Sequence, residues 1–179
     1  MKKILILNTG GTISMSEDQR TGKVAPTDSN PIGVGGNIFS YIGDLHVEDL
    51  YHLASPQITQ NEMLGIKNRI NKAVQEGYDG VVVTHGTDTL EETAYYLELT
   101  LDVNIPIVIT GAMRSSNEIG ADGLANLRSS LVVATDEESR DKGVLVVMND
   151  EVHTATYVTK THTTNVATFQ TPTFGPIGL

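Results

Sequence analysis

Short apolar runs that alternate with amphipathic stretches are the feature that most limits how this chain can fold. Three of these runs, GVVVT, PIVIT and GVLVVM, are apolar almost throughout. Such runs are typical of strands that are buried on both faces, as the strands of a parallel sheet are. Strands that alternate with helices form an α/β fold with helices packed on the sheet. The sequence therefore predicts an α/β protein, a three-layer sandwich around a mostly parallel sheet.

The predicted elements follow from the period of the apolar residues. The predicted strands are Lys3–Leu7, Val47–Leu53, Gly80–Thr84, Pro106–Thr110 and Gly143–Met148. Apolar residues at helical spacing predict helices over Asn61–Glu76, Leu90–Leu101 and Ala121–Ala134. Glycine is common just beyond a helix end, so we expect Gly77 to close the first of them.

Two stretches do not fit a closed α/β unit. Ser14–Gly36 is polar, rich in glycine and without periodicity, and it is too long for a passive connection. We interpret it as a mobile binding loop near a site, with simple disorder as the alternative. The end of the chain, TPTFGPIGL, resembles a linker. We therefore expect one domain over residues 1–175 and the start of a linker at 176–179, leading to a domain that is absent.

Charge and composition narrow the class of protein. The chain has 179 residues, about one domain, with 22 acidic and 12 basic side chains. That balance repels nucleic acid and anionic lipid, so neither is an expected partner. The chain has no cysteine, and the apolar run in MKKILIL stops after four residues, which is shorter than the core of a signal peptide. We expect a cytoplasmic protein.

Two polar loops follow predicted strands. NTGGT covers residues 8–12 and THGTDT covers residues 84–89. Ligands of an open parallel sheet bind outside the carboxyl ends of its strands, so the two loops are expected at one edge. Glycine tolerates positive φ and lets backbone N–H groups approach a ligand. Such groups can stabilise an oxyanion while a hydroxyl attacks a carbonyl carbon, so the pair suggests acyl transfer.

A threonine hydroxyl needs a base and a group that orients the base. Thr12 and Thr87 supply the candidate hydroxyls, and Asp88 lies beside the second. His85 from the same loop could be the base. Lys160, in the polar stretch TYVTKTHTTN, is the other candidate, because a desolvated lysine can also act as a base.

Each of these residues has a purely structural interpretation. Asp88 could cap the helix that follows it, with Glu91 completing a capping box. His85 could be a buried structural histidine. The loop 84–89 could also hold a phosphate at a helix N-terminus, although no GxGxxG or P-loop pattern supports a nucleotide site.

A metal site is a further alternative, and it would use side chains from two loops. Their spacing matches no known metal-binding pattern, so we expect no metal and no cofactor. The four side chains are His85, Asp88, Asp150 and His153.

Several motifs occur together in a characteristic order: TGGTI at 9–13, HGTDT at 85–89, PIVITGAMR at 106–114 and VTKTHTTNVATF at 158–169. In order and spacing they resemble the bacterial L-asparaginase family over nearly the whole chain. The resemblance implies the flavodoxin-like or Rossmann-like amino-terminal domain of an amidohydrolase. It implies L-asparagine as substrate, with L-glutamine as a second one, aspartate and ammonia as products, and a homo-oligomer, a dimer or tetramer, as the complete protein.

The resemblance also implies roles for the catalytic residues. Thr12 matches the threonine that is thought to form an acyl-enzyme. Thr87, Asp88 and Lys160 match a second triad in which lysine and aspartate tune the threonine hydroxyl, which favours Lys160 over His85 as the base. Which threonine attacks first stays open.

For substrate binding, Ser55 matches a serine that holds the α-carboxylate, Asp88 would receive the α-ammonium, and the backbone of Ala112 lies where the family contacts the amide. N–H groups around Gly11, Thr12 and Thr87 are the expected oxyanion donors. The complete predicted set is Gly11, Ser55, Pro56, Gly86, Thr87, Asp88 and Ala112.

The chain departs from the family at three points. Ser14–Pro31 has no tyrosine near the nucleophile, and Pro56 replaces a substrate-binding glutamine. The smaller second domain, which contributes an acidic residue to a neighbouring subunit, is missing, so the isolated domain is expected to be weakly active or inactive. Two alternatives remain: an amino-acid-binding module without turnover, and the amidase subunit that supplies ammonia for tRNA-dependent glutamine formation. That subunit would carry a domain before the first strand, whereas TGGTI begins eight residues from Met1.

Overall fold

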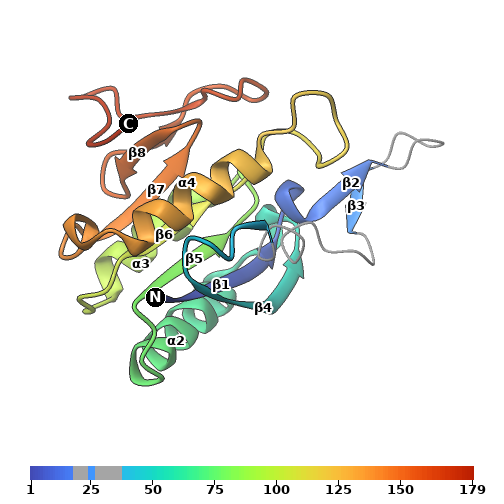
Figure 1. Cartoon of the computed structure of the whole chain (residues 1–179). Coiled ribbons are helices and arrows are strands. Elements are labelled where there is room, and N and C mark those ends of the chain that lie inside the picture. Colours follow the sequence, from blue (N-terminus) through green and yellow to red (C-terminus); the bar gives the residue numbers. More distant parts are fainter. Residues whose placement is uncertain (18–23, 27–37) are drawn as a thin grey trace.

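A six-stranded sheet forms the middle layer of the protein, as the computed structural model shows for residues 1–17, 24–26 and 38–179 (Figure 1). The strand order is β4-β1-β5-β6-β7-β8. All pairs are parallel except β7 with β8. These strands are β1 (Lys3–Gly10), β4 (Asp44–Leu53), β5 (Gly80–Thr84), β6 (Ile107–Thr110), β7 (Val144–Met148) and β8 (Glu151–Thr154). The predicted α/β class and mostly parallel sheet are confirmed.

The order of the parallel strands creates a topological switch point between β1 and β5. From β1 the chain continues to β4 on one side, and from β4 it returns to β5 on the other side of β1. This is the flavodoxin-like order, in which ligands bind where the two connections diverge, beyond the carboxyl ends of the strands. The carboxyl ends of β1 and β5 are therefore the place to look for a site.

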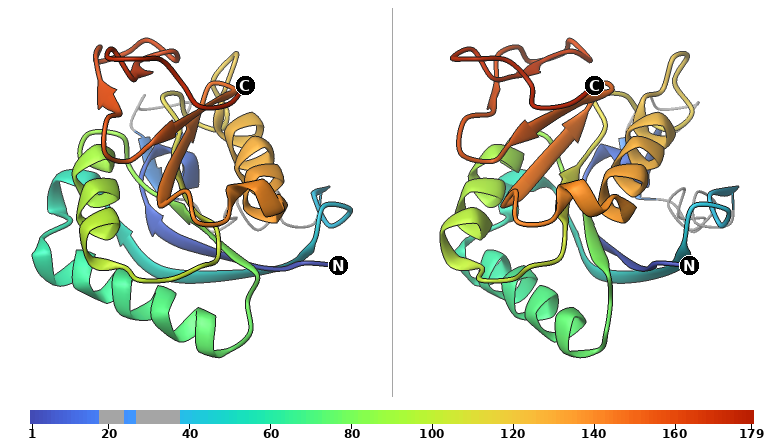
Figure 2. Two further views of the ribbon diagram at one scale, coloured as in Figure 1. Left: turned by 90° about the vertical axis from the view of Figure 1, so that its left-hand side faces the viewer. Right: turned by 60° about the vertical axis from the view of Figure 1, so that its left-hand side comes forward.

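Helices cover both faces of the sheet (Figure 2). Helices α2 (Gln60–Gln75) and α3 (Leu90–Thr100) lie on one face, and α4 (Gly123–Thr135) lies on the other. Strand β1 supplies both cores, because successive side chains of a strand point to opposite faces. Leu5 and Leu7 belong to the cluster with α2 and α3, whereas Ile4 and Ile6 belong to the cluster with α4.

Local signals fix both ends of α2. Thr59 Oγ1 accepts a hydrogen bond from the Asn61 N–H at 3.3 Å, and the Glu62 carboxylate accepts one from the Thr59 N–H at 2.8 Å. This reciprocal pair is a capping box. Gly77 follows the helix with φ of 76°, so the prediction that it closes α2 is confirmed.

Several short strands were not predicted. Strand β1 continues three residues beyond Leu7, since Asn8 still pairs with both neighbouring strands. Two antiparallel pairs lie outside the main sheet: β2 (Met15–Glu17) with β3 (Val24–Pro26), and β9 (Thr159–Lys160) with β10 (Phe169–Gln170). Strands of two to four residues are too short to show a period of two, which also explains why β8 was missed.

The predicted loop 14–36 contains two short strands that were not predicted, β2 and β3, and they pair with each other. Its first residue, Ser14, is the last residue of the 3₁₀-helix η1 (Thr12–Ser14). The interpretation of a mobile binding loop otherwise concerns residues 18–23 and 27–36, which lie outside the described residues.

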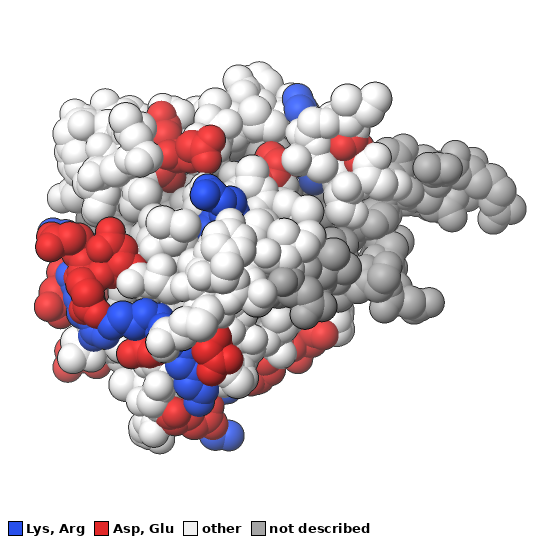
Figure 3. Space-filling view, viewed as in Figure 1, with Lys and Arg blue, Asp and Glu red and all other residues white. Residues whose placement is uncertain are grey.

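The end of the chain contacts the sheet through β8. The Val152 N–H donates to the Gly178 carbonyl at 3.0 Å, and the Ile177 N–H donates to the Val152 carbonyl at 2.8 Å. The division into 1–175 and 176–179 stays a prediction. None of the described helices is both long and apolar enough to span a bilayer. Acidic and basic side chains are mixed on the face shown in Figure 3.

Candidate active site

The switch point brings the two polar loops together. Asn8 pairs with Thr84 in the β1–β5 ladder, so NTGGT and THGTDT leave the sheet side by side. The Thr9 hydroxyl donates to the Thr84 carbonyl at 2.8 Å, which ties the start of one loop to the start of the other. Their predicted position at one edge is therefore correct.

Two glycines make this close approach possible. Gly10 and Gly11 have φ of 110° and 81°, which L-residues with a side chain rarely adopt. A Cβ atom on Gly10 would lie 2.3 Å from the Leu53 carbonyl oxygen, and one on Gly11 would lie 2.4 Å from the Gly86 Cα. The turn after β1 thus packs backbone against backbone, and no other residue type fits there.

Asn8 fixes the shape of that turn. Its side chain is fully buried, and its Oδ1 accepts hydrogen bonds from the Gly10 N–H and the Thr84 hydroxyl, both at 3.0 Å. Its Nδ2 donates to Asp49 Oδ1 at 2.7 Å. A buried polar group whose oxygen and nitrogen both have partners is costly to disturb, so Asn8 holds the loop in one conformation.

Thr12 begins η1 at this edge and is half-buried. Among the described residues, none makes a hydrogen bond with its hydroxyl. The Gly11 N–H donates to the Leu53 carbonyl at 3.2 Å. Contrary to the prediction, this N–H is therefore not free to donate to an oxyanion. Of the expected donors, the N–H groups of Thr12 and Thr87 remain, and neither has an acceptor within the described part of the chain.

Lys160 reaches the second loop from β9. Its Nζ lies 3.0 Å from Thr87 Oγ1 and 2.8 Å from Asp88 Oδ1. The Lys160 side chain is 14% exposed and that of Asp88 is 67% exposed, so the cation is shielded while its carboxylate partner faces solvent. The fold therefore joins the three predicted residues Thr87, Asp88 and Lys160 into one hydrogen-bonded unit.

Ser55 joins the same unit from the other side. It is buried at the start of the 3₁₀-helix η2 (Ser55–Gln57). Its Oγ accepts a hydrogen bond from the Asp88 N–H at 3.1 Å, and its carbonyl accepts one from the Thr89 hydroxyl at 2.7 Å. Among the described residues, none accepts a hydrogen bond from the Ser55 hydroxyl, which leaves that donor for a ligand. A Cβ on Gly86 would lie 2.8 Å from this Oγ, so Gly86 must be glycine for Ser55 to fit.

Of the remaining predicted residues, Ala112 lies at this edge and Pro56 is exposed. Ala112 is buried just beyond the carboxyl end of β6. The next residue is held in place, since the Met113 N–H donates to both carboxylate oxygens of Asp122 at 3.0 and 3.1 Å. Pro56 follows Ser55 in η2 with an exposed ring.

The capping interpretation of Asp88 is wrong. Helix α3 begins at Leu90, and its N-cap residue is Thr89, whose side chain makes no capping hydrogen bond. Asp88 instead pairs with Lys160, and the Glu91 carboxylate accepts hydrogen bonds from β9.

His85 is a structural residue. It is fully buried, with Nδ1 at 2.7 Å from the Gly86 carbonyl and Nε2 at 2.9 Å from the Thr93 hydroxyl. A carbonyl can only accept, so Nδ1 carries the proton and Nε2 accepts from Thr93. Burial lowers the pKa of His85, which keeps the ring neutral. Both nitrogens are occupied, and the geometry leaves Lys160 as the group next to Thr87.

The metal alternative fails because its four side chains point to different partners. Asp88 pairs with Lys160, the Asp150 carboxylate accepts from the Ser129 hydroxyl at 3.1 Å, and His153 Nδ1 lies 3.0 Å from Thr171 Oγ1. Within the described residues, no three histidine or acidic side chains are grouped closely enough to hold an ion.

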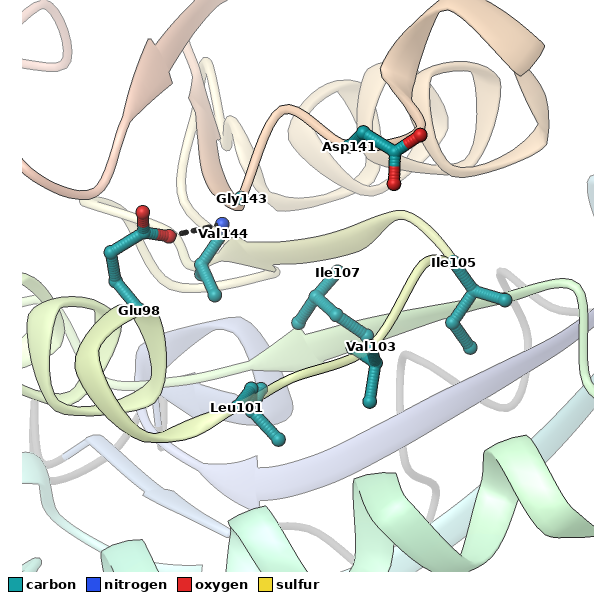
Figure 4. A pocket seen from close by; sticks show the side chains of 8 residues that line it. All are labelled: Glu98, Leu101, Val103, Ile105, Ile107, Asp141, Gly143 and Val144. Atoms are coloured by element: carbon teal, nitrogen blue, oxygen red, sulfur yellow. Dashed lines mark hydrogen bonds between the residues drawn. The ribbon is translucent and has the colours of Figure 1, made fainter.

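A separate cavity of about 130 Å³ lies at the opposite edge of the sheet (Figure 4). Its lining includes Ile107 and Val144, the first residues of β6 and β7. The Glu98 carboxylate accepts a hydrogen bond from the Val144 N–H at 2.6 Å, so its charge has a partner. This cavity lies at the amino ends of strands whose carboxyl ends form the candidate site.

Sequence reasoning missed Glu91, Asn8 and Asn126 as residues that support the site. Asn126 is buried in α4, donates to the Gly111 carbonyl at 3.0 Å and accepts from the Asn149 N–H at 2.9 Å. The sequence did carry a signal that Asn126 is buried, because it lies directly before Leu127, a residue of the apolar stripe of α4. Glu91 gave no such signal, because an acidic residue in the first turn of a helix is common.

Comparisons with known proteins agree with this geometry. The family model described as "Asparaginase, N-terminal" matches residues 3–179. The chain is 41% identical to L-asparaginase 2 of Escherichia coli, covering 99% of this chain and 52% of that one. It is 35% identical to a glutaminase-asparaginase of Pseudomonas fluorescens, covering 100% and 51%. The crystal structure of a probable cytoplasmic L-asparaginase from Campylobacter jejuni superposes with a TM-score of 0.91 at 38% identity, covering 99% and 55%. The chain thus spans about half the length of the relatives it matches.

Proposed function

Because the chain belongs to the asparaginase family, we propose that the protein carrying it hydrolyses the side-chain amide of L-asparagine to L-aspartate and ammonia. The observation that supports this most directly is the contact of Lys160 Nζ with Thr87 Oγ1 and Asp88 Oδ1. A hydroxyl, a base within hydrogen-bond reach and a carboxylate that orients the base are what a threonine needs for acyl chemistry.

In the first step, the Thr12 oxygen attacks the amide carbon of the substrate. Its proton passes to the substrate nitrogen, which leaves as ammonia, and an ester between Thr12 and the aspartyl group remains. The carbonyl oxygen carries negative charge in the tetrahedral intermediate. The N–H groups of Thr12 and Thr87 can donate to it, and a single such donor contributes about 3 kcal/mol to an acyl-transfer barrier.

In the second step, water attacks the ester carbon, the bond to Thr12 breaks, and aspartate leaves while the hydroxyl of Thr12 regains a proton. We assign the handling of protons to the unit formed by Thr87, Lys160 and Asp88. The 14% exposure of the Lys160 side chain supports this assignment, because a proton carrier works best away from bulk water.

Ser55 and Asp88 are proposed to bind the two charged groups of the substrate. The free hydroxyl proton of Ser55 would donate to the α-carboxylate, and the exposed carboxylate of Asp88 would pair with the α-ammonium. The Asp88 N–H bond to Ser55 Oγ keeps these two groups adjacent, which suits a ligand whose carboxylate and ammonium share one carbon. Gly11, Gly86 and Ala112 supply backbone around this position, and Pro56 lies at its margin.

L-Glutamine is the second proposed substrate. The similarity to a protein named glutaminase-asparaginase favours it, since the two amides differ by one methylene group. A pocket discriminates one methylene by only about 1–3 kcal/mol. The ratio of kcat/KM for the two amides measures this preference, and we expect asparagine to be favoured.

The experiment that tests the proposed function measures ammonia release by the protein and its Thr12→Ala, Thr87→Ala and Thr12→Ser variants. Loss of a nucleophile lowers kcat by on the order of 10⁴-fold or more, and serine should restore part of it. Mass spectrometry of a rapidly quenched reaction should detect an aspartyl ester on the peptide that contains Thr12. An ester on Thr87 would instead identify Thr87, and not Thr12, as the attacking nucleophile. Tight aspartate binding without ammonia release would instead indicate an amino-acid-binding module.

We further propose that residues 1–175 act as the catalytic domain of a larger protein, that 176–179 begin its linker, and that the complete protein is a cytoplasmic dimer or tetramer. The chain covers only about half the length of its relatives, which supports the proposal of a larger protein. The Campylobacter jejuni protein is named a cytoplasmic L-asparaginase, which supports the proposed cytoplasmic location. Light scattering on the purified protein and cell fractionation with a periplasmic marker test the oligomer and the location.

A further inference from the structure

We propose that Glu91 is a positioning residue that sets where Lys160 stands relative to Thr87 and Asp88. This inference rests on the proposed function, because it assigns the source of the geometry on which that function depends. The Glu91 side chain makes no hydrogen bond with the hydroxyl of Thr12 or Thr87 among the described residues; it contacts the strand that carries Lys160.

The contacts of Glu91 are specific to β9. Its Oε1 accepts a hydrogen bond from the Thr159 hydroxyl at 3.3 Å, and its Oε2 accepts one from the Lys160 N–H. The two carboxylate oxygens therefore hold two successive residues of a strand that lies 68 and 69 positions further along the chain. Hydrogen bonds to an ionised acceptor are shorter and about twice as strong as neutral ones.

Strand β9 needs such an anchor. It has two residues and, within the described part of the chain, pairs with β10 alone, in a small sheet separate from the six-stranded one. Val158 and Phe169 pack into the core beside this pair, which keeps the hairpin on the protein. Apolar packing is non-directional, so it does not by itself fix the position of the Lys160 backbone relative to Thr87 and Asp88. The two bonds to Glu91 do.

One segment thereby holds both ends of Lys160. Thr87 and Asp88 receive the Nζ atom, and Glu91 receives the backbone N–H of the same residue. All three acceptors lie within five successive residues at the start of α3. One short segment, a loop and the first turn of one helix, therefore contacts both the backbone and the side-chain end of Lys160.

The test compares Glu91→Gln with Glu92→Gln in the protein that carries this chain. Glu92 is the next residue of the same helix turn, but it is exposed and has no hydrogen-bond partner among the described residues. Glutamine keeps the shape of Glu91 while turning one acceptor into an NH₂ donor, which faces either the Lys160 N–H or the Thr159 hydroxyl. A misplacement of about 1 Å can cost a hundredfold in rate, so we expect kcat to fall between about tenfold and a hundredfold.

Three further readouts separate positioning from a general loss of structure. KM for L-asparagine should change less than twofold, the thermal midpoint should match that of Glu92→Gln, and hydrogen exchange at the Lys160 amide should accelerate only in Glu91→Gln. Thr159→Val, which removes one hydroxyl and keeps the β-branched shape, should give a smaller fall in kcat. If Glu91→Gln does not fold, Thr159→Val with the same readouts decides the question.

The proposal is overturned if Glu91→Gln, or Thr159→Val in its place, lowers kcat no more than Glu92→Gln does. It is also overturned if the fall in kcat is accompanied by an equal rise in KM. These outcomes are distinct from failure of the proposed function. In that case the unmodified protein itself would release no ammonia, whereas the exchange of the Lys160 amide would still report on the anchor.

Discussion

Gly11 packs against Gly86 at the switch point, and a Cβ atom on Gly11 would lie 2.4 Å from the Gly86 Cα. The atoms in contact are backbone atoms of two neighbouring strand ends, so neither can rotate away as a side chain would. The contact joins the loop that carries Thr12 to the loop that carries Thr87. The separation of the two hydroxyls is therefore a property of the sheet.

Gly11→Ala should destabilise the protein by about 3 kcal/mol or more and abolish ammonia release, because overpacking adds to the cost of positive φ. Gly77→Ala is the matched control. Gly77 also has positive φ, 76°, but a Cβ there would meet nothing within 4 Å. Only the conformational cost of about 1 kcal/mol applies to it, and kcat should not change. Urea unfolding and ammonia release measure both variants; equal destabilisation of the two would show that the loops are not tightly packed.

Lys160→Met should lower kcat by on the order of 10²–10⁴-fold, as expected for loss of a residue that transfers protons. Methionine keeps the length of the side chain and removes the ammonium group. The exposed Lys142 offers a control, since Lys142→Met removes the same charge far from the site. The thermal midpoint should move little in either variant, because the partner Asp88 is largely exposed and such pairs contribute less than about 1 kcal/mol. Steady-state kinetics that show equal kcat for the two variants would remove Lys160 from the mechanism.

Asn126→Ala should cost about 1–3 kcal/mol in the free energy of unfolding, because it leaves the Asn149 N–H and the buried Gly111 carbonyl without their side-chain partner. The control is Asn68→Ala, at an exposed position within α2, where a change within about 0.5 kcal/mol is expected. Denaturant titration of both variants measures the difference. A cost at Asn126 no larger than at Asn68 would mean that its side-chain hydrogen bonds contribute no net stability.

Stability should fall as the pH drops below about 6.5, the ordinary pKa of histidine. Burial lowers the pKa of His85 in the folded protein, so in that range the unfolded chain binds a proton that the folded chain does not. The free energy of unfolding then decreases with falling pH, by at most about 1.4 kcal/mol per pH unit for one group. Above the ordinary pKa both states are neutral and the contribution is complete. Burial lowers the pKa of His153 in the same direction, against the opposing effect of the Glu151 carboxylate.

Thermal unfolding of His85→Asn between pH 7 and pH 5 measures how much His85 contributes to the loss of stability at low pH. Asparagine keeps an N–H donor for the Gly86 carbonyl and does not titrate, so this variant should show a shallower decrease than the unmodified protein. His52→Asn, at an exposed position, is the control and should keep the full decrease. An unchanged slope in His85→Asn would show that His85 is not responsible.

The long elements could be predicted because each carries its own local signal. Gly80–Thr84 was predicted with the bounds that the structure shows, since five successive buried residues leave little choice between strand and loop. The end of α2 was signalled by Gly77. By contrast, β8, β9 and β10 have only two to four residues each, so no local period marks them.

The site divides in the same way. NTGGT and HGTDT were recognisable because a strand end followed by glycine and hydroxyl residues is a local pattern. The bond from the Asp88 N–H to Ser55 Oγ and the anchor at Glu91 were not, because each joins segments more than 30 residues apart. From the sequence, Asp88 and Glu91 could equally have formed a capping box at the start of the following helix, without any role in catalysis.

The sequence by itself determined which residues can supply the chemistry: two threonines beside flexible glycines, one acidic side chain, and two candidate bases. The family resemblance favoured Lys160 over His85, but only the tertiary structure shows which of the two side chains lies next to the Thr87 hydroxyl. His85 is only two residues before Thr87 in the chain, yet its ring is buried and both of its nitrogens are hydrogen-bonded. Lys160 is 73 residues away, yet its Nζ lies 3.0 Å from Thr87 Oγ1. The physical reason is that a proton moves over hydrogen-bond distances in space, and those distances are set by the order in which strands pair.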